Sequence, residues 1–535
     1  MITGGIQRFF RPSRSSEAEI AMRGSLAGST EFAHASKDSI LENGTLPVPE
    51  KSDVSSREMP GLCSPVPVRA ARGRGLAVAD CGNDCFNVVG HSDFWQQYDG
   101  LYAARLRQLR GVVDEEARAL WSPVVKLHCF LGAISGHVQA CKTCVSVVVV
   151  GILFRCLHSR CDAIAVTRKS MMASTGHAGG VLDDLETAES SLASQADQFF
   201  LEDETMRVEL EFSQTVVAAL CTGLVVAVNG RATADGKFAV QALCFPRALA
   251  PPSTLPPFRE SSRQPATFIA FVSGLHFGDA CATAAHICLA EWLSGKRHVA
   301  VVCDGTAAVP SGSAVLCVVV CGGLLAPALA SAPENHALQA MKDADSFLAQ
   351  LCASVPVKLM PGRGDPTGAC LPQAPLLPHL FGKLRVCCDF QSVGNPYKAT
   401  FGSLRLLGHA GQPVDDILRC SSVCDPLAAL ALALDAHHLA PTAPDTLAAR
   451  SLPLDGKDPF VLGAADFETP HVLFSGGHGQ AGHLWHVRTG VQCIVVPCFR
   501  AMPAVVLVNL CAPRDVRVVS FLAGKELDAG AVAGV

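Results

Sequence analysis

The sequence predicts two folded parts, a small β-barrel followed by a larger α/β domain. Short apolar runs separated by turn residues fill positions 123–250, as expected for a barrel of short strands. Five prolines crowd residues 251–265, which indicates a linker between domains. Beyond it, over residues 266–525, apolar strands alternate with helical patterns, as in an α/β sheet with helices on its faces.

The N-terminal region, residues 1–90, is rich in Ser, Gly, Pro and charge and shows no sustained hydrophobic period, so we predict that it is disordered. Within it, residues 3–10 resemble the sliding-clamp-binding motif, in which one helical turn presents three apolar anchors. The anchors are Ile6, Phe9 and Phe10. Thr3 departs from the motif, which has Gln there. The arginines up to Arg14 also fit a mitochondrial targeting peptide, and an unstructured tail is the third alternative.

A helix is predicted over residues 91–122, where apolar side chains recur at spacings of three and four. The strands of the barrel are predicted at 145–154, 215–228 and 238–245. Asn229-Gly230 and Asp235-Gly236 are predicted turns between them. The polar stretch 168–198 is predicted to be a loop inserted into the barrel.

The α/β domain is predicted to begin with alternating elements. The expected strands are 267–272, 314–320 and 355–360, and the expected helices are 281–293 and 335–353. Ser331 and Glu334 are expected to form the capping box of the second helix. Further strands are expected at 472–474, 491–496 and 504–510, with few helical signals between them.

The composition of the chain argues against some classes of protein. A net charge of −5 argues against a general nucleic-acid binder, which would show a basic face. Many of the 24 cysteines lie inside apolar runs, as expected of reduced thiols in the cytosol or nucleus. The apolar stretch 312–330 is about long enough to span a bilayer, but Gly322, Gly323 and Pro327 interrupt it. We therefore predict a buried strand and turn, and no membrane association.

Four loops of the α/β domain each follow an apolar strand. They are Gly274-Leu275-His276, Gly322-Gly323-Leu324-Leu325-Ala326, Gly362-Arg363-Gly364-Asp365 and Gly477-His478-Gly479-Gln480. In order, they resemble four motifs of calcineurin-like metallophosphoesterases: Asp-x-His, Gly-Asp-x-x-Asp, Gly-Asn-His-Asp and Gly-His-x-His. Such enzymes hold two cations about 3.5–4 Å apart with carboxylate and imidazole ligands.

Most ligand positions of these loops carry residues that cannot bind a metal. The replacements are Gly274, Gly323, Ala326, Arg363, Gly364 and Gln480. The survivors are His276, Asp365 and His478. Without the bridging carboxylate they are not expected to hold a binuclear centre, so we predict no catalytic residues, no metal and no cofactor. A single weakly bound cation is the alternative, because His483 and His486 follow His478.

Other metal and catalytic signatures are weak. Cys141 with Cys144, and Cys81 with Cys85, have the spacing of zinc ligands, but neither pair has a well-placed second pair. The sequence contains no Gly-x-Ser-x-Gly nucleophile elbow and no phosphate-binding loop of the Gly-x-x-x-x-Gly-Lys type.

Several further segments occur in the order of one family. They are residues 97–98, 105–106, 109–110, 201–204, 236–238, 354–367, 371–373, 395–397, 439–447, 458–460 and 470–472. Over about residues 93–523 the chain resembles the small, B-type subunits of eukaryotic replicative DNA polymerases, most closely those of DNA polymerase delta.

The resemblance implies an oligonucleotide-binding-type (OB) β-barrel joined to a calcineurin-like phosphoesterase domain with a degenerate metal site. It also implies a non-catalytic scaffold that acts in DNA replication and repair synthesis in the nucleus. The implied partners are the C-terminal metal domain of the catalytic subunit and a further accessory subunit, with DNA reached only through the complex. The sliding clamp would be a partner through residues 3–10.

Two other functions stay open at this point. One is a metal-dependent phosphodiesterase or 3′–5′ exonuclease that rebuilds a site from His276, Asp365 and His478, with His483 as a further candidate ligand. The other is the small subunit of polymerase alpha or epsilon.

Overall fold

The computed structural model describes two-thirds of the chain in separate stretches. They are residues 78–79, 86, 98–122, 126–128, 131, 146–159, 191–212, 219–253, 266–279, 283–296, 302–303, 309–331, 333–451, 457–463 and 468–521. The clamp-binding motif, most of the predicted insertion and both cysteine pairs with zinc-like spacing lie outside these residues. The described residues all belong to one compact unit.

Five strands close into a barrel. They are β3 (Val147–Cys156), β4 (Gln198–Glu202), β5 (Arg207–Phe212), β6 (Val225–Ala232) and β7 (Phe238–Cys244). The pairing runs β3–β4–β5–β7–β6 and returns to β3, and only β5 and β7 pair in parallel. This is the pairing order of a five-stranded OB-fold, so the predicted barrel is confirmed. A short strand, β2 (Lys126–His128), extends it beside β3.

One predicted turn of the barrel is right and the other is wrong. At Asp235-Gly236 the chain turns between β6 and β7, and Gly236 has a φ of +84°. Asn229-Gly230 instead lies inside β6, at a shift in the register of its pairing with β7. Glycine is needed there for another reason, because a Cβ on Gly230 would lie 2.2 Å from the carbonyl oxygen of Ala239.

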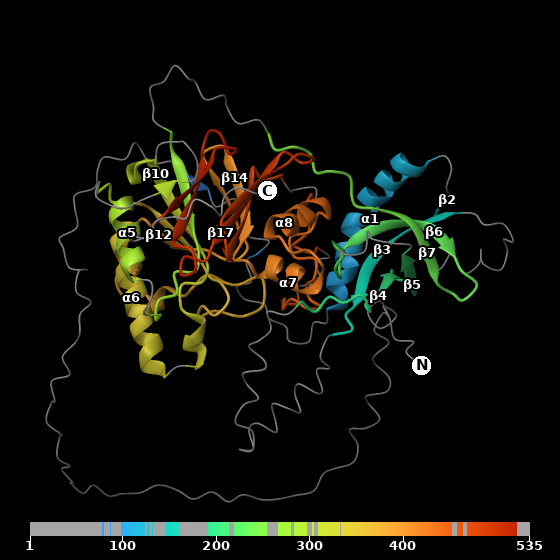
Figure 1. The fold of residues 1–535 in the computed structure, drawn as a ribbon, viewed down its shortest axis with the longest axis horizontal. Coiled ribbons are helices and arrows are strands. Elements are labelled where there is room, and N and C mark those ends of the chain that lie inside the picture. The colour runs from blue at the N-terminus through green and yellow to red at the C-terminus, as the bar shows by residue number, and fades with distance from the viewer. Residues whose placement is uncertain are drawn as a thin grey trace, which may run out of the picture. The chain divides into compact units, whose positions relative to one another are not determined.

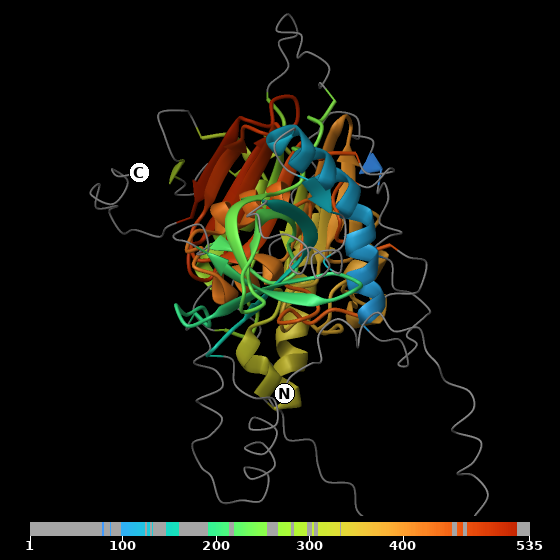
Figure 2. The same ribbon diagram turned by 90° about the vertical axis from the view of Figure 1, so that its right-hand side faces the viewer.

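The predicted N-terminal helix is confirmed as α1 (Asp99–Trp121). Its apolar stripe is buried against outward-facing residues of β3 and β6. Figure 2 shows the helix running alongside the barrel. The contacting side chains include Leu106, Leu109 and Val113 of the helix and Val148, Val150 and Ala227 of the strands. The helix thus covers part of the outer face of the barrel.

The larger part contains two stacked sheets (Figure 1). In one sheet the strand order is β12 (Phe390–Ser392), β11 (Val357–Met360), β10 (Val315–Cys321), β8 (Phe268–Val272), β18 (Ala504–Asn509), β19 (Val516–Ser520) and β9 (Val302–Cys303). In the other it is β1 (Val78–Ala79), β13 (Tyr397–Phe401), β14 (Leu404–His409), β15 (Val472–His478), β17 (Val491–Pro497) and β16 (Gly482–His486). We call them the first and the second sheet.

Helices cover the outer face of each sheet, so the part has four layers (Figure 1). The first sheet packs on α5 (Thr283–Leu293) and α6 (Glu334–Cys352), and the second on α7 (Gln412–Cys420) and α8 (Pro426–Asp435). The inner faces pack on each other, with Phe271 and Phe474 at a ring-centroid distance of 5.1 Å. The sequence predicted one sheet with helices on its faces, whereas the structure has two. Most strands of the second sheet come from residues 397–497, which lie in the sequence between β12 and β18 of the first sheet.

The predicted strands and helices of this part are confirmed within a few residues at each end, but the capping box is wrong. Ser331 ends a 3-10 helix (Pro327–Ser331), and the N-cap of α6 is Pro333, which makes no side-chain cap. The apolar stretch at 312–330 contains the buried strand β10, as predicted. Among the residues that the structure describes, no helix is long and apolar enough to cross a membrane.

Candidate functional site

The four predicted loops meet at one end of the two sheets. β8, β10 and β11 are parallel neighbours, so their following loops emerge along one edge. The backbone N–H of Gly274 donates to the carbonyl of Gly322 at 2.9 Å, and that of His276 donates to Gly323 at 3.0 Å. The fourth segment begins within β15 of the second sheet, which includes Gly477 and His478, and Gly476 of the same strand lies against Cys321 at the end of β10. The sequence therefore placed these loops correctly.

Backbone fills the space where the motifs would put carboxylates. A Cβ on Gly323 would lie 2.8 Å from the Cα of Gly274, and one on Gly322 would lie 2.8 Å from the Cα of Gly362. A Cβ on Gly274 would lie 2.5 Å from the Sγ of Cys498. Gly274 and Gly323 also have φ values of +64° and +69°, which L side chains rarely adopt. An aspartate cannot occupy position 274 or 323 unless the loops move apart.

Asp365 retains the carboxylate of the motif but has a structural role. Its carboxylate accepts backbone N–H bonds from Gly323 at 3.0 Å, Leu325 at 3.0 Å and Gly362 at 2.7 Å. Burial raises the pKa of Asp365 to about 6, although these backbone donors act to lower it. Both oxygens are committed to joining the second loop to the third, so they face the backbone rather than a metal.

His478 belongs to a series of polar contacts, buried except for Asp415, that the sequence did not reveal. Its Nε2 lies 2.6 Å from the Oγ of Ser475, and its Nδ1 lies 3.6 Å from the Oδ1 of Asp415. Burial lowers the pKa of His478 to about 4. The three groups stand in the order of a hydrolase triad, but Ser475 has no exposed surface and its hydroxyl has no access to a substrate. His409 is the last member of this series of contacts, with its Nδ1 3.4 Å from the hydroxyl of Ser475.

The third survivor, His276, contacts neither of the other two through any bond in the described residues. Its Nδ1 lies 3.9 Å from the Sγ of Cys498. Burial lowers the pKa of His276, and Arg500 lowers it further. Arg363, Gly364 and Gln480 lie on the surface, while Ala326 is buried and has no ligand atom in its side chain.

The two further histidines after His478 do not complete a site. They lie in β16, where His483 is exposed and His486 is buried, with its Nδ1 2.8 Å from the Oγ1 of Thr489. Within the described stretches, no group of three or more His, Cys, Asp or Glu side chains is placed to hold a metal ion. The residues present do not fit the two-metal centre that the motifs imply, because the carboxylate positions 274 and 323 are glycines with no room for a side chain and position 326 is an alanine.

A buried arginine joins the barrel, the helix and the larger part. The side chain of Arg105 in α1 has no exposed surface, and its Nε bonds the Oδ2 of Asp458 at 2.9 Å. Its other nitrogens donate to the carbonyls of Gly223 at 3.2 Å, Pro441 at 2.8 Å and Ala443 at 2.7 Å. Burial alone would raise the pKa of Asp458, but His438 and Arg105 hold it well below its usual range. The family-like segments 439–447 and 458–460 thus meet at Arg105.

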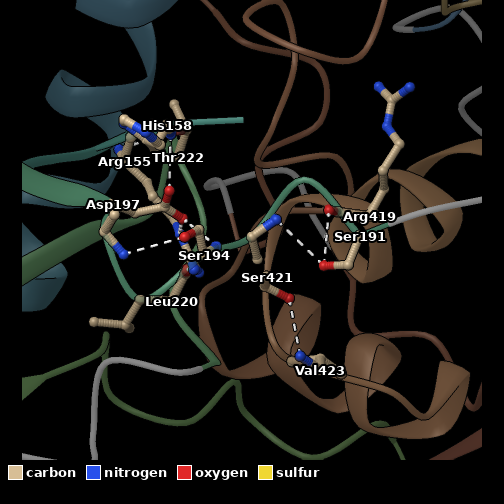
Figure 3. Close-up of polar contacts among 12 residues, drawn as sticks. Arg155, His158, Ser191, Ser194, Asp197, Leu220, Thr222, Arg419, Ser421 and Val423 are labelled. Atoms are coloured by element: carbon tan, nitrogen blue, oxygen red, sulfur yellow. Dashed lines mark hydrogen bonds and ion pairs between the residues drawn. The ribbon is translucent and has the colours of Figure 1, made fainter. Parts of the chain in front are cut away.

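A second set of polar contacts anchors the segment before β4 (Figure 3). Asp197 accepts bonds from the backbone of His158 and Ser194 and from the Nε of Arg155, each at 2.8 or 2.9 Å. The backbone N–H of Leu192 donates to the carbonyl of Arg419 in α7 at 2.7 Å. These bonds attach the barrel to the helix layer of the second sheet, whose apolar core is continuous with the barrel interior.

Comparisons with known proteins agree with this architecture. The family model described as the DNA polymerase delta subunit OB-fold domain matches residues 97–243. The model that describes the B subunits of DNA polymerases alpha and epsilon matches residues 269–481. The chain belongs to the small, B-type subunits of DNA polymerases.

Individual relatives narrow the family further. The DNA polymerase delta small subunit of Oryza sativa subsp. japonica is 29% identical, over 79% of this chain and 93% of the relative. The DNA polymerase delta subunit 2 of Drosophila melanogaster is 29% identical, over 82% of this chain and 96% of the relative. The DNA polymerase delta small subunit of Saccharomyces cerevisiae is 25% identical, over 61% of this chain and 71% of the relative. Within the B-type subunits, the chain is a member of the DNA polymerase delta small subunit family.

Proposed function

We propose that this protein is a non-catalytic accessory subunit of the DNA polymerase delta complex. It holds the C-terminal metal domain of the catalytic subunit and a further accessory subunit during replication and repair synthesis. The observation that carries the proposal is the loss of space for two metal-binding carboxylates, because the backbone of Gly274 excludes a side chain at position 323 and Cys498 excludes one at position 274. The larger part would then be a calcineurin-like phosphoesterase fold whose chemistry has been lost.

The bonds and the shared core that join the barrel to the larger part support a scaffold role. Arg105 bonds four partners from distant segments, and one apolar core runs from the barrel interior to α7 and α8. A scaffold gains from such rigidity because binding partners then lose less conformational freedom on assembly.

The proposal extends to compartment and partners. The described part of the chain holds free cysteines such as Cys221 and Cys321 in its core, which fits a reducing compartment such as the nucleus. The net charge of −5 favours contact with DNA through the complex rather than through a basic face of this subunit. Because the family model for the B subunits of polymerases alpha and epsilon also matches, membership of one of those two complexes is the alternative. The identity of the catalytic subunit that co-purifies with this protein distinguishes the alternatives.

A hydrolysis assay tests the loss of chemistry. The purified chain is incubated with Mn²⁺ and either bis(p-nitrophenyl) phosphate or a single-stranded oligonucleotide. We expect the wild type to match the His276→Ala and Asp365→Ala variants, with no turnover above buffer. Manganese-dependent cleavage that disappears in His276→Ala would instead establish a phosphodiesterase or exonuclease.

A further inference from the structure

The second sheet ends in a strand whose outer side has no strand partner in the described part of the chain. β16 is last in the strand order and pairs only with β17. At the opposite end of the sheet, β1 covers β13, although it is only two residues long. The two edges therefore differ, because β1 pairs with Thr400 and Phe401 of β13, whereas no described strand pairs with the outer side of β16.

The backbone of β16 presents hydrogen-bonding groups to this open side. The carbonyl of His486 accepts a bond from the N–H of Gly490 at 2.8 Å, so the backbone of His486 faces its own hairpin. In an antiparallel pair, inward-facing and outward-facing residues alternate. The N–H and C=O groups of His483 and Trp485 therefore point away from β17.

The strand lacks the features by which proteins usually protect a sheet edge. Its sequence, Gly-His-Leu-Trp-His, contains neither proline nor lysine, and it pairs with β17 without a register shift. Apolar side chains are also exposed beside it. Leu484 is 39% exposed, and Val487 in the hairpin loop is 83% exposed. Such an edge favours the addition of another strand.

The charged side chains near β16 indicate the charge of the strand that could bind there. Between residues 479 and 490 the only Lys, Arg, Asp or Glu is Arg488, which is 47% exposed and pairs with Asp435. Arg514 is exposed and stacks on Trp485, with its guanidinium carbon 4.7 Å from the ring centroid. An acidic segment is complementary.

We propose that the outer edge of β16 binds an extended acidic segment of another subunit of the polymerase delta assembly by strand addition. This inference rests on the proposed function, since that function supplies the partner. Backbone bonds to His483 and Trp485 give the pairing, and the exposed guanidinium of Arg514 favours a carboxylate on the added strand.

Residue-resolved hydrogen exchange on the full chain, free and in the co-expressed complex, tests the proposal. The amides of His483 and Trp485 should exchange at least about tenfold more slowly in the complex. The amides of Leu484 and His486 face the hairpin and should be protected in both states. Unchanged exchange at His483 and Trp485 in an intact complex would overturn the proposal while leaving the proposed function standing. Failure of the complex to form would overturn both.

A matched pair of variants separates backbone pairing from side-chain contact. His483→Pro removes the outward N–H but no bond to β17, whereas His483→Ala keeps that N–H. We expect protection of the Trp485 amide to fall by about tenfold in the complex of His483→Pro and to stay unchanged in that of His483→Ala. Equal protection in the two variants would refute strand addition. Protection of both amides in the free chain, with a dimer by light scattering, would show that a second copy is the occupant.

Discussion

Replacing Arg105 with methionine tests the junction on which the scaffold depends. The side chain of Arg105 is fully buried and bonds the carboxylate of Asp458 and three carbonyls from the barrel and the 441–443 segment. Methionine has a similar length but no donor. The Asp458 carboxylate then keeps the hydrogen bond to His438 at 3.0 Å, but burial lowers the pKa of His438 to about 4, so this partner is neutral near pH 7. Breaking a buried pair in this way costs about 3–5 kcal/mol.

Urea denaturation followed by circular dichroism measures the effect, and two further variants control it. Arg107→Met alters the same helix at an exposed position, where the arginine bonds only the carbonyl of Ala103, so it should cost less than about 0.5 kcal/mol. The double variant Arg105→Met with Asp458→Asn removes the orphaned charge and should recover about 1–2 kcal/mol of the loss. Equal stabilities of Arg105→Met and Arg107→Met would refute the account of the junction.

Three further predictions concern the core, the loops and the N-terminal region. His286 is stacked between Phe277 and Phe499, with centroid distances of 4.8 and 5.4 Å, and burial lowers its pKa to about 4. As the pH falls below about 6.5, the imidazole of His286 becomes protonated in the unfolded chain but stays neutral in the folded chain, so acid destabilises the fold. His286→Phe removes this group and should reduce the stability lost between pH 7 and pH 5 by about 1–2 kcal/mol in urea titrations. An unchanged loss would contradict this. Gly323→Ala should destabilise the fold by about 1–3 kcal/mol, because its Cβ would meet Gly274, whereas Gly479→Ala has open space and should be neutral; equal melting curves would refute the packing argument. A peptide of residues 1–16 should bind the sliding clamp in calorimetry and lose that binding when Phe9 and Phe10 become alanine; equal binding by the double variant would remove the motif.

The sequence was sufficient to predict the loops of the candidate site because strong local signals precede them. Strands β8 and β10 are nearly continuous runs of β-branched and other apolar residues, which parallel strands buried on both faces require. The loops after such strands are fixed by topology, so His276, Asp365 and His478 could be placed at one end of the sheets. How these side chains are used could not be predicted. Asp365 bonds backbone N–H groups, and no residue pattern identifies those donors in advance.

The failures of prediction have a common cause, which is tertiary contact overriding a local preference. Asn229-Gly230 has the residues of a turn, but Gly230 lies within β6 because Ala239 approaches its Cα closely. Ser331 has the spacing of a helix cap, but the preceding 3-10 helix extends through it. Arg105 belongs to the family-like segment 105–106, but the sequence gives no sign of its burial, which only its distant partners reveal.

The most direct test of the central claim is a quantitative pull-down of the tagged full chain from nuclear extract, with mass spectrometry of the partners. We predict recovery of the DNA polymerase delta catalytic subunit in near-equal amount, together with a further accessory subunit. Recovery of the alpha or epsilon catalytic subunit, or of no polymerase at all, would contradict the account.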